Sequence, residues 1–215
     1  MSNSADDKGG LVGGQGTDDP AGHDAKHFSW SGSGTHDAGG DDGQAYVGPV
    51  DYLHWQYVWG GHDGTVVSSS VSDVFLKGND GDDALSAHGG RNVLDGGAGS
   101  NFLVGATGDD HGTDTFFLDG RGQAVTWDTL VNFHQGDAAT LWGFQGGTST
   151  YSWSDNEGAD GFKGATLHAE THGAGTGVNA SITFAGMSAA EAQSKLGLST
   201  GSVGGNTYLY VQNHG

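Results

Sequence analysis

The sequence predicts an all-β protein built on a short parallel β-roll of nonapeptide repeats, flanked by β-sandwich-like strands and followed by one short C-terminal helix. Three observations lead to this prediction. Glycine, an Asp or Asn side chain and leucine each recur at a spacing of nine within residues 78–110, which is typical of a coil that alternates turns with very short strands. Glycine supplies 43 of the 215 residues, which disfavours helices. Short β-prone segments lie on both sides of the repeats.

The composition provides few apolar residues for a hydrophobic core and no cysteine for disulfides. Only 34% of the residues are hydrophobic, and the absence of cysteine excludes disulfides and thiolate metal sites. The formal net charge is -19, and nearly all the carboxylates are aspartates, which suit tight turns. Nucleic acids and anionic membrane surfaces are therefore poor partners, since both require a basic surface. Divalent cations are better ones.

The hydropathy of the chain indicates neither a membrane span nor a secretory signal. No apolar run of about 18 residues exists, so we expect no membrane span. The first 16 residues lack a basic region followed by an apolar run, so we expect no N-terminal secretory signal peptide. If the protein leaves the cell, another export route must serve it.

The chain divides into four predicted segments. These are a flexible acidic, glycine-rich leader over residues 1–44, an N-terminal β cap over 45–72, a calcium-binding β-roll over 73–118 and a C-terminal β domain over 119–215. The cap combines an alternating segment, 52–59, with a β-branched and serine-rich one, 65–70, which we expect to form a packed strand pair. In the C-terminal domain, Ser188 and Glu191 form a capping-box pattern that predicts a helix stopped by Gly197.

Three regular units occupy residues 78–86, 87–95 and 96–104, each with six turn residues followed by a three-residue strand. Residues 73–76 match the end of an earlier unit, with Lys77 as one extra residue. A fourth unit opens at Gly105. A four-residue insertion in its turn makes Asp114 the turn acid and residues 115–117 the strand, which suits the apolar pattern.

The units conform to the pattern G-G-x-G-x-D-x-U-x, in which U is a large aliphatic residue, a pattern associated with calcium-binding parallel β-helices. Two units complete one coil, so each unit stacks on the unit 18 residues later, and a cation can lie between the two turns. This arrangement predicts that Asp83 faces Asn101, and that Asn92 faces Asp114 or Asp110. Asp73 with Asn92 is a third candidate pair, so we expect two or three calcium ions.

The predicted calcium ligands are the side chains of Asp73, Asp83, Asn92, Asn101, Asp110 and Asp114, with the backbone carbonyls of Gly78, Asp80, Gly89, Gly97, Gly99 and Gly108. The two asparagines keep an oxygen ligand but lack the charge of a carboxylate, so the sites should differ in strength. A metal-free solenoid or glycine-rich disorder is the competing interpretation.

Over residues 73–114 the sequence resembles the repeats-in-toxin family, whose hemolysin-type calcium-binding repeats occur in bacterial proteins exported by type I secretion. Residues 112–118 and 131–137 are similar to the closing region of that family. The resemblance implies a β-roll folded by calcium outside the cell, and an uncleaved export signal at the C-terminus. The chain departs from the family at Ala87 and His88, where glycines are usual, and its array is short.

Other functions are less well supported. The chain lacks the His-Glu-x-x-His and Gly-x-Ser-x-Gly motifs of zinc proteases and serine hydrolases, so we expect no enzyme. His23 and His27 are four residues apart, but the glycines and acids around them disfavour the helix that a histidine metal site at this spacing needs. The tryptophans could instead form a platform for sugar rings, although with so few aliphatic residues core packing is the favoured interpretation. A calcium-dependent carbohydrate-binding or adhesive module, with polysaccharide as partner, and the detached tail of a larger secreted hydrolase therefore remain the alternatives.

Overall fold

The computed structural model describes residues 33–37, 45–49, 54–57, 64, 66–78, 80–106, 112–121, 124–172 and 177–215. Within these ranges the chain is mostly β-strand, and the only helix is α2 (Ala189–Lys195). The all-β prediction is confirmed at this level. Strands β1 (Ser33–Asp37) and β2 (Ala45–Pro49) form an antiparallel pair, and the rest of the predicted leader lies outside the described residues.

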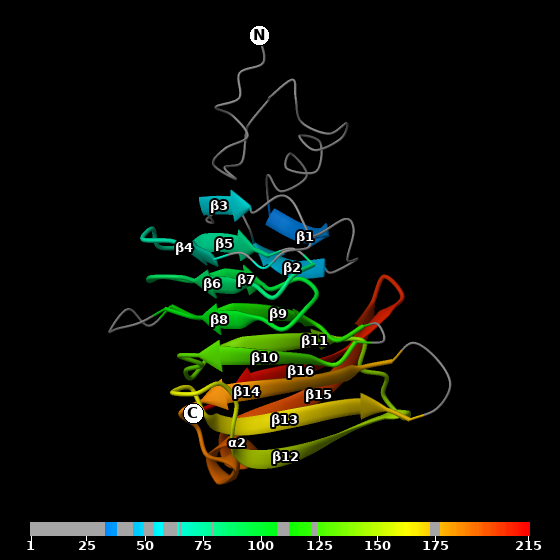
Figure 1. Cartoon of the computed structure of the whole chain (residues 1–215). Coiled ribbons are helices and arrows are strands. Elements are labelled where there is room, and N and C mark those ends of the chain that lie inside the picture. The colour runs from blue at the N-terminus through cyan, green and yellow to red at the C-terminus, as the bar shows by residue number, and fades with distance from the viewer. Residues whose placement is uncertain are drawn as a thin grey trace.

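Two mixed seven-stranded sheets make up the body of the protein, with their strands stacked from β3 to β12 (Figure 1). The first sheet contains, in order, β15 (Leu196–Val203), β16 (Asn206–Asn213), β11 (Ala138–Trp142), β9 (Thr115–Asp119), β7 (Val93–Asp95), β5 (Val74–Lys77) and β3 (His54–Tyr57). The second sheet contains, in order, β12 (Ser149–Glu157), β13 (Gly164–Thr171), β14 (Asn179–Ala185), β10 (Thr126–Val131), β8 (Phe102–Val104), β6 (Ala84–Ser86) and β4 (Val66–Ser68).

From β3 to β11 successive strands alternate between the two sheets and pair in parallel within each sheet. The register in the repeats follows the predicted coil, because Leu85 pairs with Leu103 and Leu76 with Leu94. The next coil is longer: β7 pairs with β9, which begins at Thr115, as the four-residue insertion predicts. The turn thus absorbs the insertion without disturbing the strand register.

The N-terminal cap differs from its prediction. Strand β3 pairs with β5 in the first sheet, whereas β4 pairs with β6 in the second sheet, so the two cap strands do not pair with each other. Val67 lies opposite Leu85, 18 residues later, which is the spacing of one coil. The coil therefore begins earlier than the nonapeptide motif, because strand register requires the period but does not require the glycines of the turns.

The C-terminal residues extend the same two sheets with mainly antiparallel strands. Strand β14 pairs in parallel with β10, while β12, β13, β15 and β16 add antiparallel edges. The capping box of α2 is present, since Ser188 and Glu191 bond each other's backbone N–H. The helix ends at Lys195 with Leu196 as its C-cap, one residue before the predicted stop at Gly197. Strand β15, which was not predicted, follows directly and pairs along its whole length with β16.

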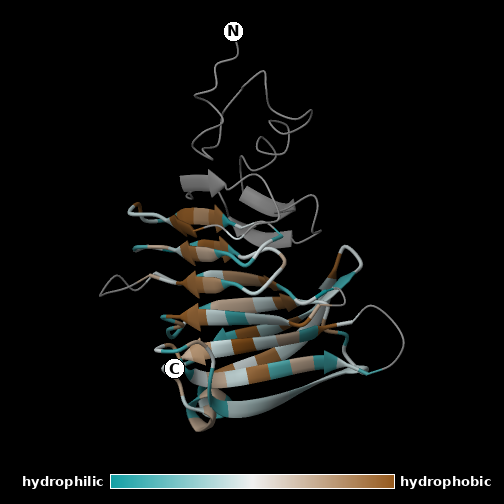
Figure 2. Cartoon of the chain, viewed as in Figure 1, coloured by the Kyte–Doolittle hydropathy of each residue, from teal (hydrophilic) through white to brown (hydrophobic). Residues whose placement is uncertain are grey.

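The space between the sheets holds one continuous hydrophobic core, and the strands of the stack carry most of the hydrophobic colouring in Figure 2. The middle residue of each repeat strand points inward, so Leu85, Leu94 and Leu103 are at most 1% exposed. Phe116 continues this row and packs on Phe133, with ring centroids 5.8 Å apart. Among the described residues no helix is long and apolar enough to cross a membrane.

Replacing Leu103 by Ala should destabilise the protein by about 2–5 kcal/mol, because it leaves a cavity at a fully buried position of the coil. The matched control is Val66→Ala in β4, where the side chain is 82% exposed and the change should stay within about 0.5 kcal/mol. Urea unfolding followed by circular dichroism measures both values. Equal losses at the two positions would contradict the inward register of the repeat strands.

Candidate metal site

The turns of the coil lie along two edges of the stack. First-edge turns lead from the first sheet into the second and include residues 78–83 and 96–101. Second-edge turns lead back and include residues 87–92, 105–114 and 132–137. Because the strands are only a few residues long, equivalent turn residues from successive coils lie directly above one another.

On the first edge the stacked residues are Asp83, Asn101 and Asp128. The Asp83 backbone N–H donates to Asn101 Oδ1 at 3.0 Å. Both the backbone N–H and the side-chain Nδ2 of Asn101 donate to Asp128 Oδ1, at 2.9 and 3.0 Å. All three residues are at most 3% exposed, so they form a buried polar ladder that links three coils.

A second ladder on the other edge contains Asn92, Asp114 and Asp137. The backbone N–H and Nδ2 of Asn92 donate to Asp114 Oδ1 at 3.0 and 2.8 Å. The Asp114 N–H in turn donates to Asp137 Oδ1 at 2.8 Å. The Val74 N–H donates to Asn92 Oδ1 at 3.1 Å and begins the ladder. Both edges thus repeat one hydrogen-bond scheme.

These ladders bring together two of the predicted pairs, Asp83 with Asn101 and Asn92 with Asp114. The third pair is offset by one residue, because Asp73 adopts a positive φ of 57° and its Oδ1 accepts the Arg91 N–H at 2.8 Å. Lys77, the extra residue of that unit, ends β5 and forms a buried ion pair with Asp95 at 3.1 Å. Asp110 and Gly108 lie outside the described residues.

Two ladder residues were missed by the sequence reasoning, Asp128 and Asp137. Both begin the three-residue pattern of an Asp or Asn, one intervening residue and an inward apolar side chain, as in Asp128-Thr129-Leu130. The same pattern occurs at residues 83–85 and 101–103. A search for this shorter pattern without the glycines would have found them.

Two glycines allow a carboxylate and a backbone carbonyl to approach the chain closely, an arrangement that we call a cradle. A Cβ at Gly78 would collide with Asp83 Oδ2 of its own turn and would lie 2.5 Å from the Gly96 carbonyl oxygen of the next first-edge turn. On the second edge, a Cβ at Gly105 would lie 2.6 Å from Asp114 Oδ2 and 3.3 Å from the Asn132 carbonyl oxygen. Each cradle thus brings a carboxylate and a backbone carbonyl from consecutive turns to one point.

The two asparagine turns differ from the cradles. At Gly96 the nearest atom to an added Cβ would be Asn101 Nδ2, at 2.7 Å, which is a hydrogen-bond donor and cannot bind a cation. The Asn92 turn begins with Ala87, whose side chain is buried. The departures at Ala87 and His88 therefore lie in a turn where an amide replaces the carboxylate. The amides of Asn92 and Asn101 both donate to the acid of the next coil.

Burial makes the ladder carboxylates difficult to ionise. Desolvation raises the pKa of Asp128 and of Asp137 to about 7 and also raises the pKa of Asp114, although hydrogen bonds from backbone N–H groups oppose the shift. Asp128 Oδ2 is fully buried and has no hydrogen-bond partner. Asp119 and Asp82 raise the pKa of Asp128 further by charge repulsion. A buried carboxylate oxygen without a hydrogen-bond partner is costly, and a bound cation would remove that cost.

The remaining predicted ligands are more dispersed. Asp80 is exposed, and the Gly89 and Gly99 carbonyls accept the Asp73 N–H at 3.2 Å and Asn101 Nδ2 at 3.4 Å. Gly97 has a φ of 72°, and its N–H donates to Asp95 Oδ1 at 3.0 Å. No group of three or more His, Asp or Glu side chains converges anywhere in the described ranges. Any cation at the edges would therefore depend largely on backbone carbonyls, as calcium sites in tight turns commonly do.

Comparison of the chain with protein-family models, with curated proteins and with solved structures gave no match.

Proposed function

We propose that this chain is an extracellular calcium-binding protein or module of the repeats-in-toxin type, non-catalytic itself, whose coil is a β-roll that folds when calcium enters its turns. The observation that supports this most directly is the pair of cradles, one on each edge, in which Asp83 and Asp114 each meet a carbonyl oxygen of the next turn. The donors are all oxygens, which is the ligand type that calcium prefers.

The predicted ligands would have unequal roles in binding calcium. Asp83 with the Gly96 carbonyl, and Asp114 with the Asn132 carbonyl, would hold the two principal ions. Asp128 Oδ2, the buried oxygen without a partner, is the best-placed ligand for a third. Asn92 and Asn101 act instead as hydrogen-bonded spacers between coils, because their amide nitrogens face the neighbouring acids.

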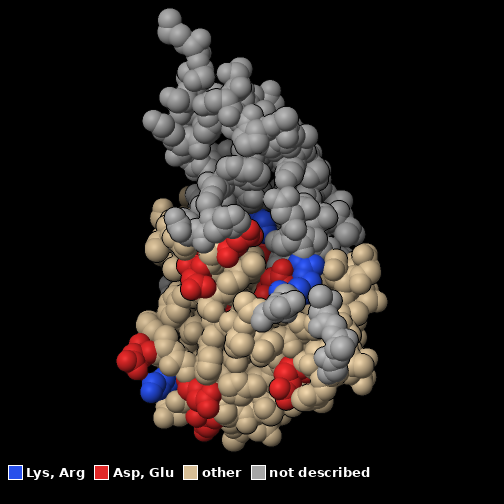
Figure 3. Space-filling model, turned by 45° about the vertical axis from the view of Figure 1, so that its right-hand side comes forward, with Lys and Arg blue, Asp and Glu red and all other residues tan. Residues whose placement is uncertain are grey.

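The charge of the chain explains how calcium could control folding. Acidic side chains outnumber basic ones in the sequence, and Figure 3 shows several acidic groups on one face. Without divalent cations, stacking the turns brings buried carboxylates together against desolvation and repulsion. A bound dication supplies the opposite charge, so the free energy of binding contributes to folding. Low calcium would keep the chain extended, and high calcium would close the coil.

Titration of chelator-treated protein with calcium tests the proposal. Far-ultraviolet circular dichroism should report a gain of β-structure as free calcium rises to the millimolar range, and calorimetry should count two or three ions. Magnesium should act more weakly, because it prefers octahedral water-rich coordination. Asp83→Asn and Asp114→Asn should each remove one ion, whereas Asp160→Asn at an exposed turn should remove none. A spectrum and a melting temperature that ignore calcium would refute the proposal and favour the metal-free solenoid.

The proposed route out of the cell is type I secretion, with an export signal in residues 192–215. In the folded chain these residues belong to α2, β15 and β16, and β16 pairs with β11 of the coil. The signal would therefore be accessible only before calcium-driven folding. Residues 192–215 fused to a passenger protein should direct its secretion by a type I transporter, and the passenger alone should stay inside. No difference between the two would refute the export proposal and leave the calcium proposal standing.

A further inference from the structure

The outer face of the second sheet has a polar groove of about 400 Å³ over β12, β13 and β14, on the side away from the core. Its lining includes Val125, Thr150, Ser152, His168, Glu170 and Asn179. It is separate from the edge turns that contain the cradles. Strand β12 shows little hydrophobic colouring in Figure 2, whereas the repeat strands are mostly brown.

One row of side chains crosses this face from β10 to β12. Trp127 pairs with Ser181, Ser181 with His168, and His168 with Ser152. Because Ser181 is small, the rings of Trp127 and His168 meet above it at 5.7 Å in an edge-to-face contact. The Trp127 indole remains 37% exposed beside the groove. By contrast, Trp142 is 1% exposed and Trp153 packs on Phe184, so these two tryptophans serve the interior.

The row is held rigidly. Trp127 Nε1 donates to Thr183 Oγ1 at 2.8 Å, and the Trp127 backbone N–H donates to Ser100 Oγ at 3.0 Å. His168 is fixed from both sides, since Nδ1 lies 2.8 Å from Ser181 Oγ and Nε2 lies 2.8 Å from Ser154 Oγ. An exposed aromatic ring that is fixed before binding loses little conformational entropy when a ligand stacks on it.

The chemistry of the groove selects a class of ligand. Its lining offers hydroxyl, amide and carboxylate groups but no Lys or Arg, so phosphates and other anions are disfavoured. Glu170 is already paired with His172 at 3.3 Å, which reduces the attraction for cations. Groups that both donate and accept hydrogen bonds, next to an exposed indole, match a neutral sugar ring with its hydroxyls and its apolar C–H face.

His168 also connects Ser181 to Glu157, whose Oε2 lies 3.0 Å from Nε2, in the order of a nucleophile, a base and an acid. Ser181 is only 7% exposed beneath the two rings, and its neighbouring backbone groups are engaged in the sheet. Attack on a substrate needs an accessible oxygen and free oxyanion donors. We therefore assign these residues to positioning Trp127.

We propose that the groove over β12, β13 and β14, with Trp127 at its side, binds neutral polysaccharide. The proposal does not depend on which cation folds the coil. It requires only the folded second sheet.

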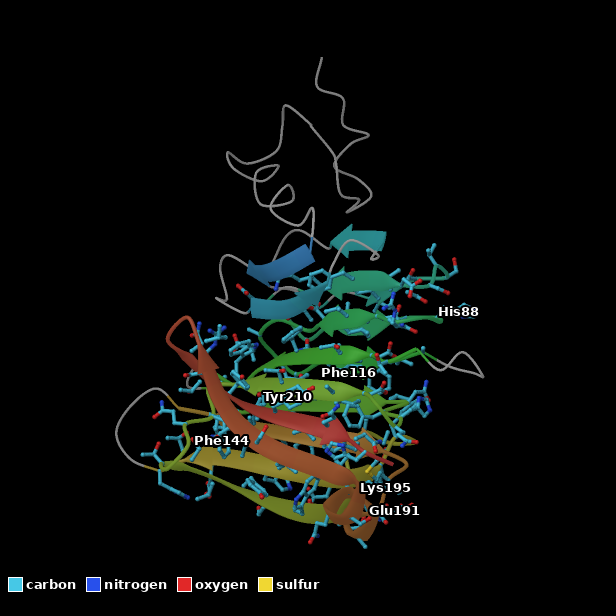
Figure 4. All side chains as sticks on the ribbon, turned by 180° about the vertical axis from the view of Figure 1, so that it is seen from behind. His88, Phe116, Phe144, Glu191, Lys195 and Tyr210 are labelled. Atoms are coloured by element: carbon cyan, nitrogen blue, oxygen red, sulfur yellow. The ribbon has the colours of Figure 1, made fainter. Side chains whose placement is uncertain are left out.

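Affinity gel electrophoresis of the full chain in millimolar calcium, with dextran, xylan, galactomannan and mixed-linkage β-glucan as probes, tests the proposal. At least one probe should retard the protein, and Trp127→Ala should weaken that binding about ten-fold or more. Trp127→Phe, which keeps a ring, should lose less. The matched control is Tyr210→Ala, since Tyr210 lies between buried Leu209 and Val211 and points outward from the other sheet (Figure 4). Circular dichroism confirms that each variant is folded.

Two further measurements, at different salt concentrations and with charged polymers, distinguish neutral ligands from anionic and cationic ones. Retardation should be the same in 50 and 500 mM sodium chloride, and anionic alginate should give none. Binding to polylysine that disappears with salt, without binding to any neutral probe, would overturn the proposal in favour of a cationic ligand. Folded wild-type protein that ignores all four neutral probes would overturn it, as would equal binding by Trp127→Ala. The circular dichroism titration decides the calcium proposal separately, so the two can fail independently.

Discussion

The metal-free protein should be more stable at pH 5.5 than at pH 8.5, which is the reverse of what salt-bridged aspartates produce. Burial raises the pKa of Asp128 and of Asp137 to about 7 in the folded state, whereas an unfolded aspartate titrates near pH ~3.9. The folded state therefore binds more protons between these values, and stability falls as pH rises through about 7. Each group should contribute roughly 2 kcal/mol to the difference over this interval.

Urea unfolding in chelator at several pH values measures this effect, and the same series in calcium provides the control. Calcium should flatten the profile, because a bound cation favours the ionised carboxylates. Stability that rises with pH in chelator would contradict the assigned burial of the two carboxylates. If calcium left the dependence of stability on pH unchanged, Asp128 and Asp137 would not be calcium ligands.

Asp128→Asn should stabilise the metal-free protein at pH 8 by about 2 kcal/mol and at the same time weaken its response to calcium. The amide keeps an oxygen for the two Asn101 donors and removes a buried charge, although its new N–H₂ group has to find a partner. The loss of the partnerless Oδ2 should reduce the calcium-induced rise in melting temperature. Thermal melts with and without calcium measure both effects.

Asp137→Asn is the matched control for this substitution. Both Asp137 oxygens accept backbone N–H groups, from Asp114 at 2.8 Å and from His134 at 2.6 Å. An amide there would direct its N–H₂ group at another donor, so this variant should be less stable than Asp128→Asn in chelator. If the two variants were equally stable, the difference between the two ladder ends would be disproved.

Much of the fold could be predicted because it follows from local periodicity. The spacing of Leu85, Leu94 and Leu103 gave the strand register, and the pattern around Asp114 located β9 despite the inserted residues. Strand β15 was not predicted, because Gly197 was interpreted only as the end of the helix. In the structure β15 forms a hairpin with the next strand, β16, around the two-residue turn Gly204-Gly205, so the sequence did contain a local signal for it. For β16, only the pairing with β11 joins residues far apart in the chain.

The candidate site shows the same division. The repeat predicted which turn residues would stack, but it could not show that Asn92 and Asn101 would direct amide nitrogens toward the next acid, because that depends on side-chain rotation within the stack. The nonapeptide motif also did not mark Asp128, which follows Asn101 by 27 residues instead of 18, although the shorter pattern Asp128-Thr129-Leu130 is present in the sequence. Hydrogen bonds across coils decided both outcomes.

By itself the sequence determined the period, the alternation of turn and strand, and the acidic chemistry of the turns, since each depends on residues a few positions apart. Only the tertiary structure decided which carboxylates are buried together, which oxygen lacks a partner, and that Trp127 faces outward beside a polar groove while Trp142 is enclosed. The physical reason is that burial and desolvation depend on packing between residues far apart in the chain, and a linear pattern does not encode that packing.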